Sequence, residues 1–557
     1  MKEPNLPTSL DDPAARSAFL AGMCSPAAYA ALHPVTAPVR LVETHVSWVF
    51  LTGPYAYKIK KPLRLSFLDY GSASRREAFC REELRLNRRH APELYVDVVG
   101  IGGSPAQPRP GAPGPWFEHA LRMRQFDPDL ELARLLEAQA VTAPELAEFG
   151  AKMARMHESA TIADAASGYG SPPVLHCVNL ANFAEIAAAL PPGIHSAQLD
   201  RLRAGIEQAF AMVSPLMEQR RQDGRVRECH GDLHCGNVVR WMDRLVAFDG
   251  LEFDPALRFI DVANDLAFLT MDLAVHGRDD LRGSVLNAWT SYGGDYQALE
   301  LLPYYESYRA LVRAKVAAVR ELQRSGGAVE PRRAIGRTAA ATGGSGPGTG
   351  AIMVQHYLEW ARRRAIRGAP ALVVMTGLSG SGKTWMARRI AAACYALHVR
   401  SDVERKRLAG LGPLVDSGSA PDAGLYTPEF GARTYARLVD CVSSCLRGDE
   451  NVVIDAANLR RHERDAFRHA AAAAGAGARV AIVHCQAPID VLRQRVAARR
   501  ASGSDASEAT VELLDRQPGY WEPLTDAEMS LALAVDTRDT ATVEAALRAV
   551  RSVTRFE

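Results

Sequence analysis

The sequence contains little cysteine, no long apolar segment and almost no net charge. Its 557 residues include nine cysteines, and the closest pair, Cys441 and Cys445, forms a CxxxC pattern and not the CxxC of zinc sites. This distribution excludes a disulfide framework and favours a reducing compartment. No apolar run approaches the roughly 18 residues of a membrane-spanning helix, and the N-terminus lacks an apolar signal-peptide core. We therefore expect a cytoplasmic protein with no membrane association.

Lysine is also scarce. The net charge of +2 argues against nucleic acid as a partner, but only eight of the 66 basic residues are lysine. A skew of this kind fits a GC-rich coding bias. Where arginine is the usual cation, a lysine can still mark a site that needs a compact ammonium group. Lys58, Lys60 and Lys61 lie within four positions of one another, and Lys383 lies in a glycine-rich motif.

A change of composition divides the chain in two. Residues 326–350 are rich in Gly, Ser, Thr, Ala and Pro and have no apolar period, which is typical of a flexible linker. It separates a predicted domain at 27–325 from one at 351–557, whose core spans 371–540. The overall composition, with 47% apolar and 23% charged residues, is that of a soluble globular protein.

The first half begins with strands and continues with helices. The segments ETHVSWVFL (43–51) and AYKIKK (56–61) flank a TGPY turn and predict a β-hairpin. An amphipathic helix is expected over 74–92, ended by Pro92, and a strand over 94–101. Long helical patterns occupy most of the remainder. A small β-rich lobe followed by a helical lobe predicts an α+β fold of the bilobal, protein-kinase type.

The segment HGDLHCGN (230–237) carries the first catalytic pattern. Asp232 and Asn237 are five positions apart, and Asp249 follows twelve residues later at the end of an apolar strand. In a kinase catalytic loop an Asp accepts the proton of the substrate hydroxyl, while an Asn and a second Asp bind Mg²⁺. Asp232 would then be catalytic, and Asn237 and Asp249 would be metal ligands. The alternative is that Asp232 only stabilises a turn.

A lysine from the upstream hairpin should reach the ATP phosphates. Strand alternation places Lys58 and Lys60 on one face, so either could serve, and Lys58 is favoured because it is nearer the strand centre. The helix at 74–92 should supply a carboxylate partner. Glu83 is the favoured candidate, with Glu82 and Glu77 as alternatives, and each could instead belong to a solvated helix face.

These motifs resemble those of the aminoglycoside phosphotransferase-like kinases over roughly residues 27–325. HGDLHCGNVV is similar to the catalytic loop of that family, and IDVANDLAFL (260–269) to a downstream segment. The resemblance implies ATP- and Mg²⁺-dependent phosphorylation of a hydroxyl, and a structural role for Asp265. The glycine-rich loop that covers phosphate in protein kinases is absent, and the hairpin VFLTGPYAYK takes its place. The fold alone does not select the substrate.

The second half contains a complete P-loop. GLSGSGKT (377–384) follows the apolar strand ALVVM, precedes a helical segment and satisfies GxxxxGK[ST]. Backbone N–H groups of such a loop hold phosphates, the lysine reaches the β- and γ-phosphates, and the Ser or Thr binds Mg²⁺. Five apolar runs alternate with helical stretches here, which predicts an α/β, doubly wound, largely parallel sheet. The expected nucleotide ligands are Gly377, Ser379, Gly380, Ser381, Gly382, Lys383 and Thr384, the last also a metal ligand.

Other polar residues of this half are candidates for substrate contact. Asp402 ends the expected second strand, where an acceptor hydroxyl would bind, so we assign it a catalytic role. For each of the residues named next, a role as a strand-end cap or as a solvent-exposed side chain is as open as a role in substrate binding. The third strand ends at Asp455, a Walker-B-like or substrate-binding candidate, and 491–506 resembles a lid with two arginines on one helix face. The further substrate or lid candidates are Arg405, Asn458, Arg464, Arg495 and Arg499.

Residues 371–540 resemble the P-loop kinases near gluconate kinase, zeta toxin and polynucleotide kinase. The fusion of both halves also resembles a recurring bacterial bifunctional architecture. We therefore expect two ATP- and Mg²⁺-dependent kinase domains, each transferring the γ-phosphoryl group of ATP to a small-molecule hydroxyl. Two alternatives remain open: one half could be a nucleotide-binding regulatory module that gates the other, or the P-loop half could phosphorylate nucleic-acid ends. The acceptor molecules and the oligomeric state are not determined by the sequence.

Overall fold

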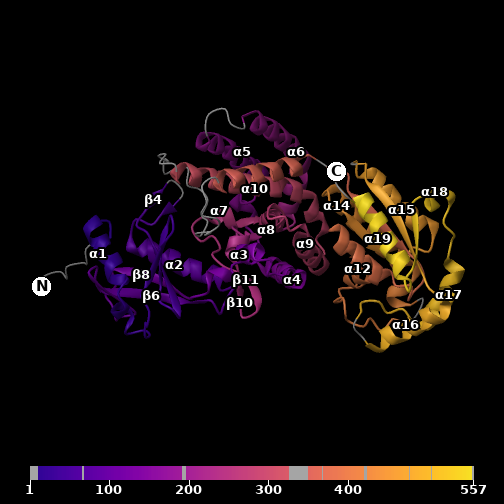
Figure 1. Cartoon of the computed structure of the whole chain (residues 1–557), viewed down its shortest axis with the longest axis horizontal. Coiled ribbons are helices and arrows are strands. Elements are labelled where there is room, and N and C mark those ends of the chain that lie inside the picture. The colour runs from indigo at the N-terminus through magenta and orange to yellow at the C-terminus, as the bar shows by residue number, and fades with distance from the viewer. Residues whose placement is uncertain are drawn as a thin grey trace.

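The structure, a computed structural model, describes residues 10–65, 68–190, 196–324, 349–366, 368–419, 423–475, 477–502 and 505–554. Three blocks lie in a row (Figure 1): a β-rich lobe, a helical lobe and a C-terminal α/β domain. The predicted linker at 326–350 falls outside the described ranges except for its last two residues. None of the helices in these ranges combines the length and apolarity needed to cross a membrane.

The N-terminal lobe is built on a six-stranded antiparallel sheet. Its strand order is β1-β2-β3-β8-β6-β7. The predicted hairpin is confirmed, with Ser47 opposite Lys60 in the register of β2 and β3. The apolar run at 43–51 forms two strands and not one, because Thr44 Oγ1 accepts the Ser47 N–H at 2.9 Å and turns the chain. The strands are β1 (Arg40–Glu43), β2 (Ser47–Leu51), β3 (Tyr55–Lys60), β6 (Tyr95–Ser104), β7 (Gln107–Pro110) and β8 (Glu118–Arg124).

Two helices cover this sheet. Helix α1 (Pro13–Met23) begins before the predicted domain start at 27, and its Phe19 packs edge-on against Phe50 and Phe117. Helix α2 (Ala73–Asn87) is the predicted amphipathic helix and ends five residues before Pro92. The short β4 (Arg64–Leu65) and β5 (Leu68–Asp69) pair between β3 and α2. Burial of Cys80 and Glu83 on α2 fixes the helix face that meets the sheet.

The helical lobe encloses two short strand pairs around the HGDLHCGN segment. Strand β9 (Val226–Glu228) pairs with β12 (Phe259–Asp261), and β10 (Val238–Trp241) pairs with β11 (Arg244–Ala247). The one-turn η4 (Cys235–Asn237) leads directly into β10. The helices are α3 (Leu132–Glu137), α4 (Ala143–Ser159), α5 (Pro172–Ala189), α6 (Ser196–Gln222), α7 (Pro255–Arg258), α8 (Val262–Val275), α9 (Asp279–Gly293) and α10 (Leu302–Arg324).

Helix α11 (Thr349–Ala365) connects the two halves. It packs on α6, α8 and α10 of the helical lobe. Its buried side chains Val354, Tyr357, Leu358 and Ala361 recur at the three- and four-residue spacing of one helix face. We propose that the boundary between the halves in space lies after α11.

The C-terminal domain has the predicted α/β, doubly wound fold. Its five-stranded sheet is parallel throughout, in the order β14-β15-β13-β16-β17. All six residues of the central strand β13 are buried, because helices cover both faces of the sheet. The strands are β13 (Ala371–Thr376), β14 (Leu397–Arg400), β15 (Val452–Asp455), β16 (Arg479–Gln486) and β17 (Ala532–Asp536). The helices are α12 (Lys383–Cys394), α13 (Ser401–Leu408), α14 (Pro428–Arg447), α15 (Arg461–Ala473), α16 (Ile489–Ser502), α17 (Val511–Arg516), α18 (Asp526–Met529) and α19 (Thr540–Thr554).

The helical lobe and the C-terminal domain share a close, polar contact. Arg282 of α9 donates to Glu450 at 2.5 and 2.9 Å, and Arg364 of α11 donates to the same carboxylate at 3.0 Å. Gly448 lies so near Leu299 that an added Cβ would come within 2.4 Å of its carbonyl oxygen. The charged groups here are buried, so the two halves form a joined unit.

Candidate active sites

The catalytic-loop residues of the first half lie in one hydrogen-bonded turn. Asn237 Nδ2 donates to the Asp232 carbonyl oxygen at 2.9 Å and to its carboxylate Oδ2 at 3.0 Å. The other amide atom, Asn237 Oδ1, is buried and accepts no hydrogen bond from the described part of the chain. A buried oxygen without a partner is costly unless a ligand satisfies it. Asn237 Oδ1 therefore fits a hard cation such as Mg²⁺, which prefers oxygen ligands.

Asp265 of α8 holds the backbone of this loop in place. Its carboxylate accepts the backbone N–H groups of His230 at 3.1 Å and Gly231 at 2.8 Å. It also accepts His157 Nε2 at 3.1 Å. Burial alone would raise the pKa of Asp265, but these donors lower it, so the carboxylate is ionised. These contacts are those of a structural residue that sets the position of Asp232.

The structure separates the roles of the two hairpin lysines. Lys58 Nζ donates to Glu83 Oε1 at 2.6 Å and contacts Asp249 Oδ1. Lys60 Nζ contacts Glu83 Oε2 and donates to Glu252 Oε1 at 2.6 Å, with its side chain fully buried. Both lysines share one strand face as expected, but Lys58 is the one beside the proposed metal ligand Asp249.

Among the candidate glutamates, Glu83 is the one that meets the lysines. Glu82 instead binds Arg85 and Arg258, and Glu77 binds Arg81. Glu83 is fully buried, whereas Glu82 and Glu77 are partly exposed. The helical pattern of the sequence does not reveal this difference, because it depends on how α2 packs against the sheet.

Glu252 was not expected from the sequence. It lies three residues after Asp249, binds Lys60 and accepts the Tyr70 hydroxyl at 2.5 Å. Asp249 itself has a left-handed φ of 61°, and its N–H donates to the Tyr95 hydroxyl at 2.9 Å. A non-glycine residue held at positive φ carries strain that its surroundings must offset. The strand-to-loop turn thus fixes the Asp249 carboxylate beside Lys58.

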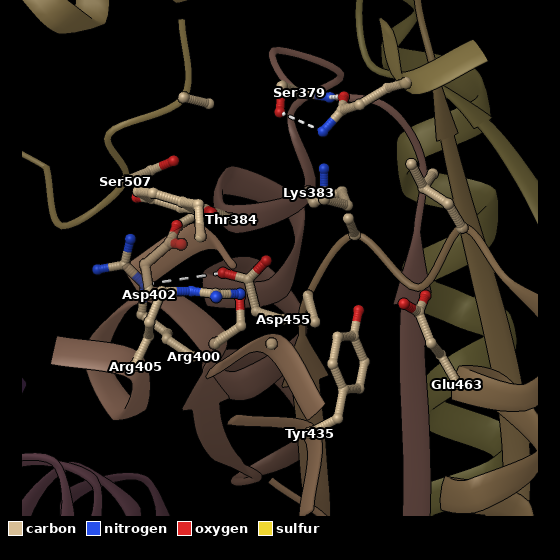
Figure 2. Close-up of a pocket in the computed structure, with 18 of the residues that line it drawn as sticks. Ser379, Lys383, Thr384, Arg400, Asp402, Arg405, Tyr435, Asp455, Glu463 and Ser507 are labelled. Atoms are coloured by element: carbon tan, nitrogen blue, oxygen red, sulfur yellow. Dashed lines mark hydrogen bonds and ion pairs between the residues drawn. The ribbon is translucent and has the colours of Figure 1, made fainter. Parts of the chain in front are cut away.

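The P-loop of the second half borders a cleft of about 1010 Å³. Figure 2 shows Thr384, Asp402 and Asp455 grouped beneath the loop tip at Ser379. Positive φ values at 377, 380 and 382 shape the loop. At Gly377 an added Cβ would also lie 2.4 Å from the Cys485 carbonyl oxygen, so only glycine fits there.

Lys383 lies inside this loop. Its Nζ donates to the carbonyl oxygens of Gly377 and Leu378, each at 2.9 Å, and pairs with no carboxylate in the described ranges. Burial lowers the pKa of Lys383, while Asp455 and Asp402 oppose that shift. The ammonium group is thus held at the base of the cleft by two neutral oxygens, which an incoming phosphate could replace.

Two groups that contact the loop come from distant segments. Gln517 accepts the Ser379 N–H at 2.7 Å and donates to Ser379 Oγ at 3.0 Å. The lid candidate Arg495 on α16 donates to Thr537 Oγ1 at 2.8 Å and to the Gly380 carbonyl oxygen at 3.3 Å. No sequence signal pointed to Gln517, because its role depends on a contact between segments 138 positions apart.

Asp402 lies on a helix and not at a strand end. Strand β14 stops at Arg400, and Asp402 is in the first turn of α13, where it lines the cleft. It makes no hydrogen bond or ion pair with any described residue. Arg405, one turn later, donates to the Leu425 carbonyl oxygen at 2.8 Å and also lines the cleft. A carboxylate without a protein partner at this place suits an acceptor hydroxyl.

Asp455 ends β15 beside the P-loop. Its carboxylate accepts His398 Nε2 at 3.1 Å and lies 3.7 Å from Arg400 Nε. Burial alone would raise its pKa, but His398, Arg400 and Lys383 lower it. Asp455 is therefore ionised and is oriented by a neighbouring strand.

Two of the substrate candidates have structural contacts. Asn458 Nδ2 donates to the Met375 carbonyl oxygen at 2.7 Å. Arg464 is fully buried and donates to Glu528 at 2.7 Å. Neither residue lines the cleft, whereas the lid candidates Arg495 and Arg499 both do.

Comparisons with known proteins found relatives that span most of the chain. Two proteins of Mycobacterium, from M. tuberculosis strain H37Rv and M. bovis, are each 26% identical over 492 residues, covering 88% of this chain and 92% of theirs. Both carry the description "uncharacterized protein". A match of this length takes in both halves.

Solved structures are similar to parts of the chain. A gluconokinase from Sinorhizobium meliloti is 23% identical, covers 34% of this chain and 93% of its own, and has a TM-score of 0.24. A choline/ethanolamine kinase family protein from Mesorhizobium loti is 13% identical, covers 62% and 99%, and has a TM-score of 0.35. Residues 372–524, which contain the P-loop and the cleft, match the family model described as an AAA domain.

Proposed function

We propose that the chain is an ATP- and Mg²⁺-dependent enzyme with two kinase-type sites. Each site transfers the γ-phosphoryl group of ATP to a hydroxyl of a small molecule. The observation that carries the proposal is the cleft of the second half, where the P-loop lysine and an unpaired carboxylate, Asp402, line one space. A phosphate-binding loop opposite an acceptor-binding acid is what phosphoryl transfer to an alcohol requires.

In the first half, Asp232 orients the acceptor hydroxyl and takes its proton. The hydroxyl oxygen bonds to the γ-phosphorus, the bond to the β-bridging oxygen breaks, and ADP leaves. Asn237 donates to one carboxylate oxygen of Asp232 at 3.0 Å, which orients this carboxylate for the acceptor. Asn237 Oδ1 and Asp249 would hold Mg²⁺, which neutralises phosphate charge when bound. Lys58, fixed by Glu83, would bind the α- and β-phosphates.

In the second half, phosphate binding replaces the two carbonyl contacts of Lys383. The backbone N–H groups at the start of α12 face the same space, and Thr384 would be a metal ligand. Asp402 orients the acceptor hydroxyl. Arg495 and Arg499 line the cleft from α16 and can stabilise charge on the transferring group.

The test uses the full-length chain with one site disabled at a time. ADP release is measured with Asp232→Asn, with Lys383→Ala and with the double variant, in the presence of fractionated cell metabolites as acceptors. We expect each single variant to keep one acceptor-dependent activity and the double variant to lose both. The proposal is refuted for a half whose variant leaves all activities at the wild-type level, and for the whole chain if the double variant still transfers phosphate.

A further inference from the structure

Helix α9 lies between the two candidate sites. In its own half it packs on α4 and α8, and in the other it packs on β14 and α12. Strand β14 is an edge strand of the parallel sheet, and α12 is the helix that begins at Lys383. One helix of the first half thus contacts the elements that form the base of the second site.

On one side, α9 is hydrogen-bonded to the support of the catalytic loop. Trp289 Nε1 donates to His157 Nδ1 at 3.0 Å. Because an indole N–H only donates, His157 Nδ1 must accept, and its proton lies on Nε2, which donates to Asp265 at 3.1 Å. Asp265 in turn accepts the N–H groups of His230 and Gly231. All of these side chains are buried, so water does not compete for the contacts.

On the other side, α9 is hydrogen-bonded to the edge strand of the P-loop sheet. Asn287 Nδ2 donates to the Ala396 carbonyl oxygen at 3.0 Å, and Asn287 Oδ1 accepts the His398 N–H at 2.6 Å. The amide therefore bonds β14 as a neighbouring strand would. The side chain of His398 then donates to Asp455 at 3.1 Å. Asn287 and Trp289 are two positions apart, so one turn of α9 is tied to both sites.

We propose that Asn287 is a positioning residue for Asp455, and that α9 thereby couples the two nucleotide sites. The inference rests on the proposed function for its activity readout. Loss of the Asn287 amide removes two hydrogen bonds from the edge strand at 396–398, which stays paired with β15 on its other side. His398 is then held less firmly, so Asp455 loses its fixed orientation beside the P-loop. A change in the catalytic loop of the first half can reach the same strand through His157 and Trp289.

The activity test measures the P-loop site in the full-length chain with the first site disabled by Asp232→Asn. We expect Asn287→Ala to lower kcat about 10-fold, the lower end for loss of an outer-shell contact. The KM for ATP should stay within about two-fold, because Asn287 contacts β14 and not the P-loop backbone. If Asn287→Ala does not fold, Asn287→Asp retains the acceptor for the His398 N–H and should keep an intermediate kcat.

Glu300→Ala is the matched control. It removes contacts across the same domain junction, to Ser444 at 2.7 Å and Arg447 at 2.8 Å, but none of them touches β14. We expect this variant to keep wild-type kcat. Equal kcat losses in the Asn287 and Glu300 variants, or a wild-type kcat in Asn287→Ala, would refute the positioning role.

Coupling is measured by binding of Mg-AMP-PNP, which needs no transfer. The Kd of the first site is determined in two proteins: the wild type, in which the P-loop site is filled, and Lys383→Ala, in which that site stays empty. We expect the two Kd values to differ about five-fold, near the low end of allosteric couplings. When both proteins also carry Asn287→Ala, the difference between their Kd values should disappear. Equal Kd values in wild type and Lys383→Ala would refute the coupling. An absence of phosphoryl transfer with an intact binding difference would refute the proposed function and leave the coupling standing.

Discussion

Three neighbouring lysines provide the sharpest test of the first site. Lys60 is fully buried between the carboxylates of Glu83 and Glu252. Lys60→Met leaves those two acids buried together without their shared cation. Breaking a buried ion pair in this way costs about 3–5 kcal/mol. Glu83 keeps Lys58 and Glu252 keeps the Tyr70 hydroxyl, so we expect the lower end, about 3 kcal/mol.

Lys58→Met should act on binding and much less on stability. The side chains of Lys58 and its partner Asp249 are 8% and 10% exposed, whereas Lys60 and both its partners are fully buried, and Glu83 would retain Lys60. We expect a destabilisation of about 1 kcal/mol and a loss of Mg-AMP-PNP affinity of at least roughly ten-fold, because a charge-assisted phosphate contact disappears. Lys61→Met is the control: Lys61 pairs at 2.6 Å with Glu43, whose side chain is 59% exposed. Such a surface pair contributes about 0.5 kcal/mol or less.

The assay is thermal unfolding of the full-length variants, with and without Mg-AMP-PNP. A loss of about 3 kcal/mol should lower the first transition by roughly 6–12 °C for Lys60→Met, while the Lys61 variant should stay within about 2 °C of wild type. The nucleotide should raise the transition of Lys60→Met more than that of Lys58→Met, whose remaining response comes from the intact P-loop site. The assignment is refuted if Lys60→Met unfolds at the temperature of the Lys61 control and responds to the nucleotide no more than Lys58→Met.

Three further predictions concern other parts of the chain. Lys383→Arg should weaken ATP binding at the P-loop by about ten-fold or more, measured by titration, because the guanidinium fork does not fit between the two carbonyl oxygens that hold Nζ; unchanged affinity would contradict this. Arg464→Met should lower stability by about 3–5 kcal/mol by leaving the buried Glu528 unpaired, with an unchanged KM for ATP; a raised KM at wild-type stability would restore a substrate role. Burial raises the pKa of Glu131 to about 7, so its contribution to the free energy of unfolding is fully present below about pH 4.5 and is lost as the pH rises through 7. In Glu131→Gln, about 3 kcal/mol of this pH-dependent loss of stability should be absent. The check is chemical denaturation of both proteins at pH 5 and pH 8; an equal change in the free energy of unfolding between the two pH values would count against it.

The sequence predicted those parts of the sites that are built from contiguous residues. The P-loop needs one strand, one glycine-rich turn and one helix start, all within 371–394, and the structure forms them as β13, the loop and α12. The catalytic loop is likewise local, since Asp232 and Asn237 meet within one turn. Strand alternation was also sufficient to place Lys58 and Lys60 on the same face.

Pattern and spacing could not predict which side chains pair when the partners lie far apart in the sequence. Nearness to the strand centre favoured Lys58 over Lys60 but did not separate their roles. That difference arises because Asp249 and Glu252, about 190 positions later, contact one lysine each. Arg464 fitted a substrate-binding pattern until its pairing with Glu528, 64 positions later, was seen. Long-range pairs of this kind depend on how whole elements pack, and a single sequence does not encode them in any local period.

The sequence by itself thus determined a P-loop, a segment with the spacing of a kinase catalytic loop, and the two fold classes that carry them, because hydrophobic period and turn chemistry act over a few residues. Only the tertiary structure decided which polar groups face the sites, which are buried in pairs, and where α9 and α11 lie. The physical reason is that burial of charge and hydrogen bonding across elements is settled only when the elements pack together. Asn287 illustrates this: in sequence it is one polar residue on a helix, and in the fold it bonds the edge strand of another domain.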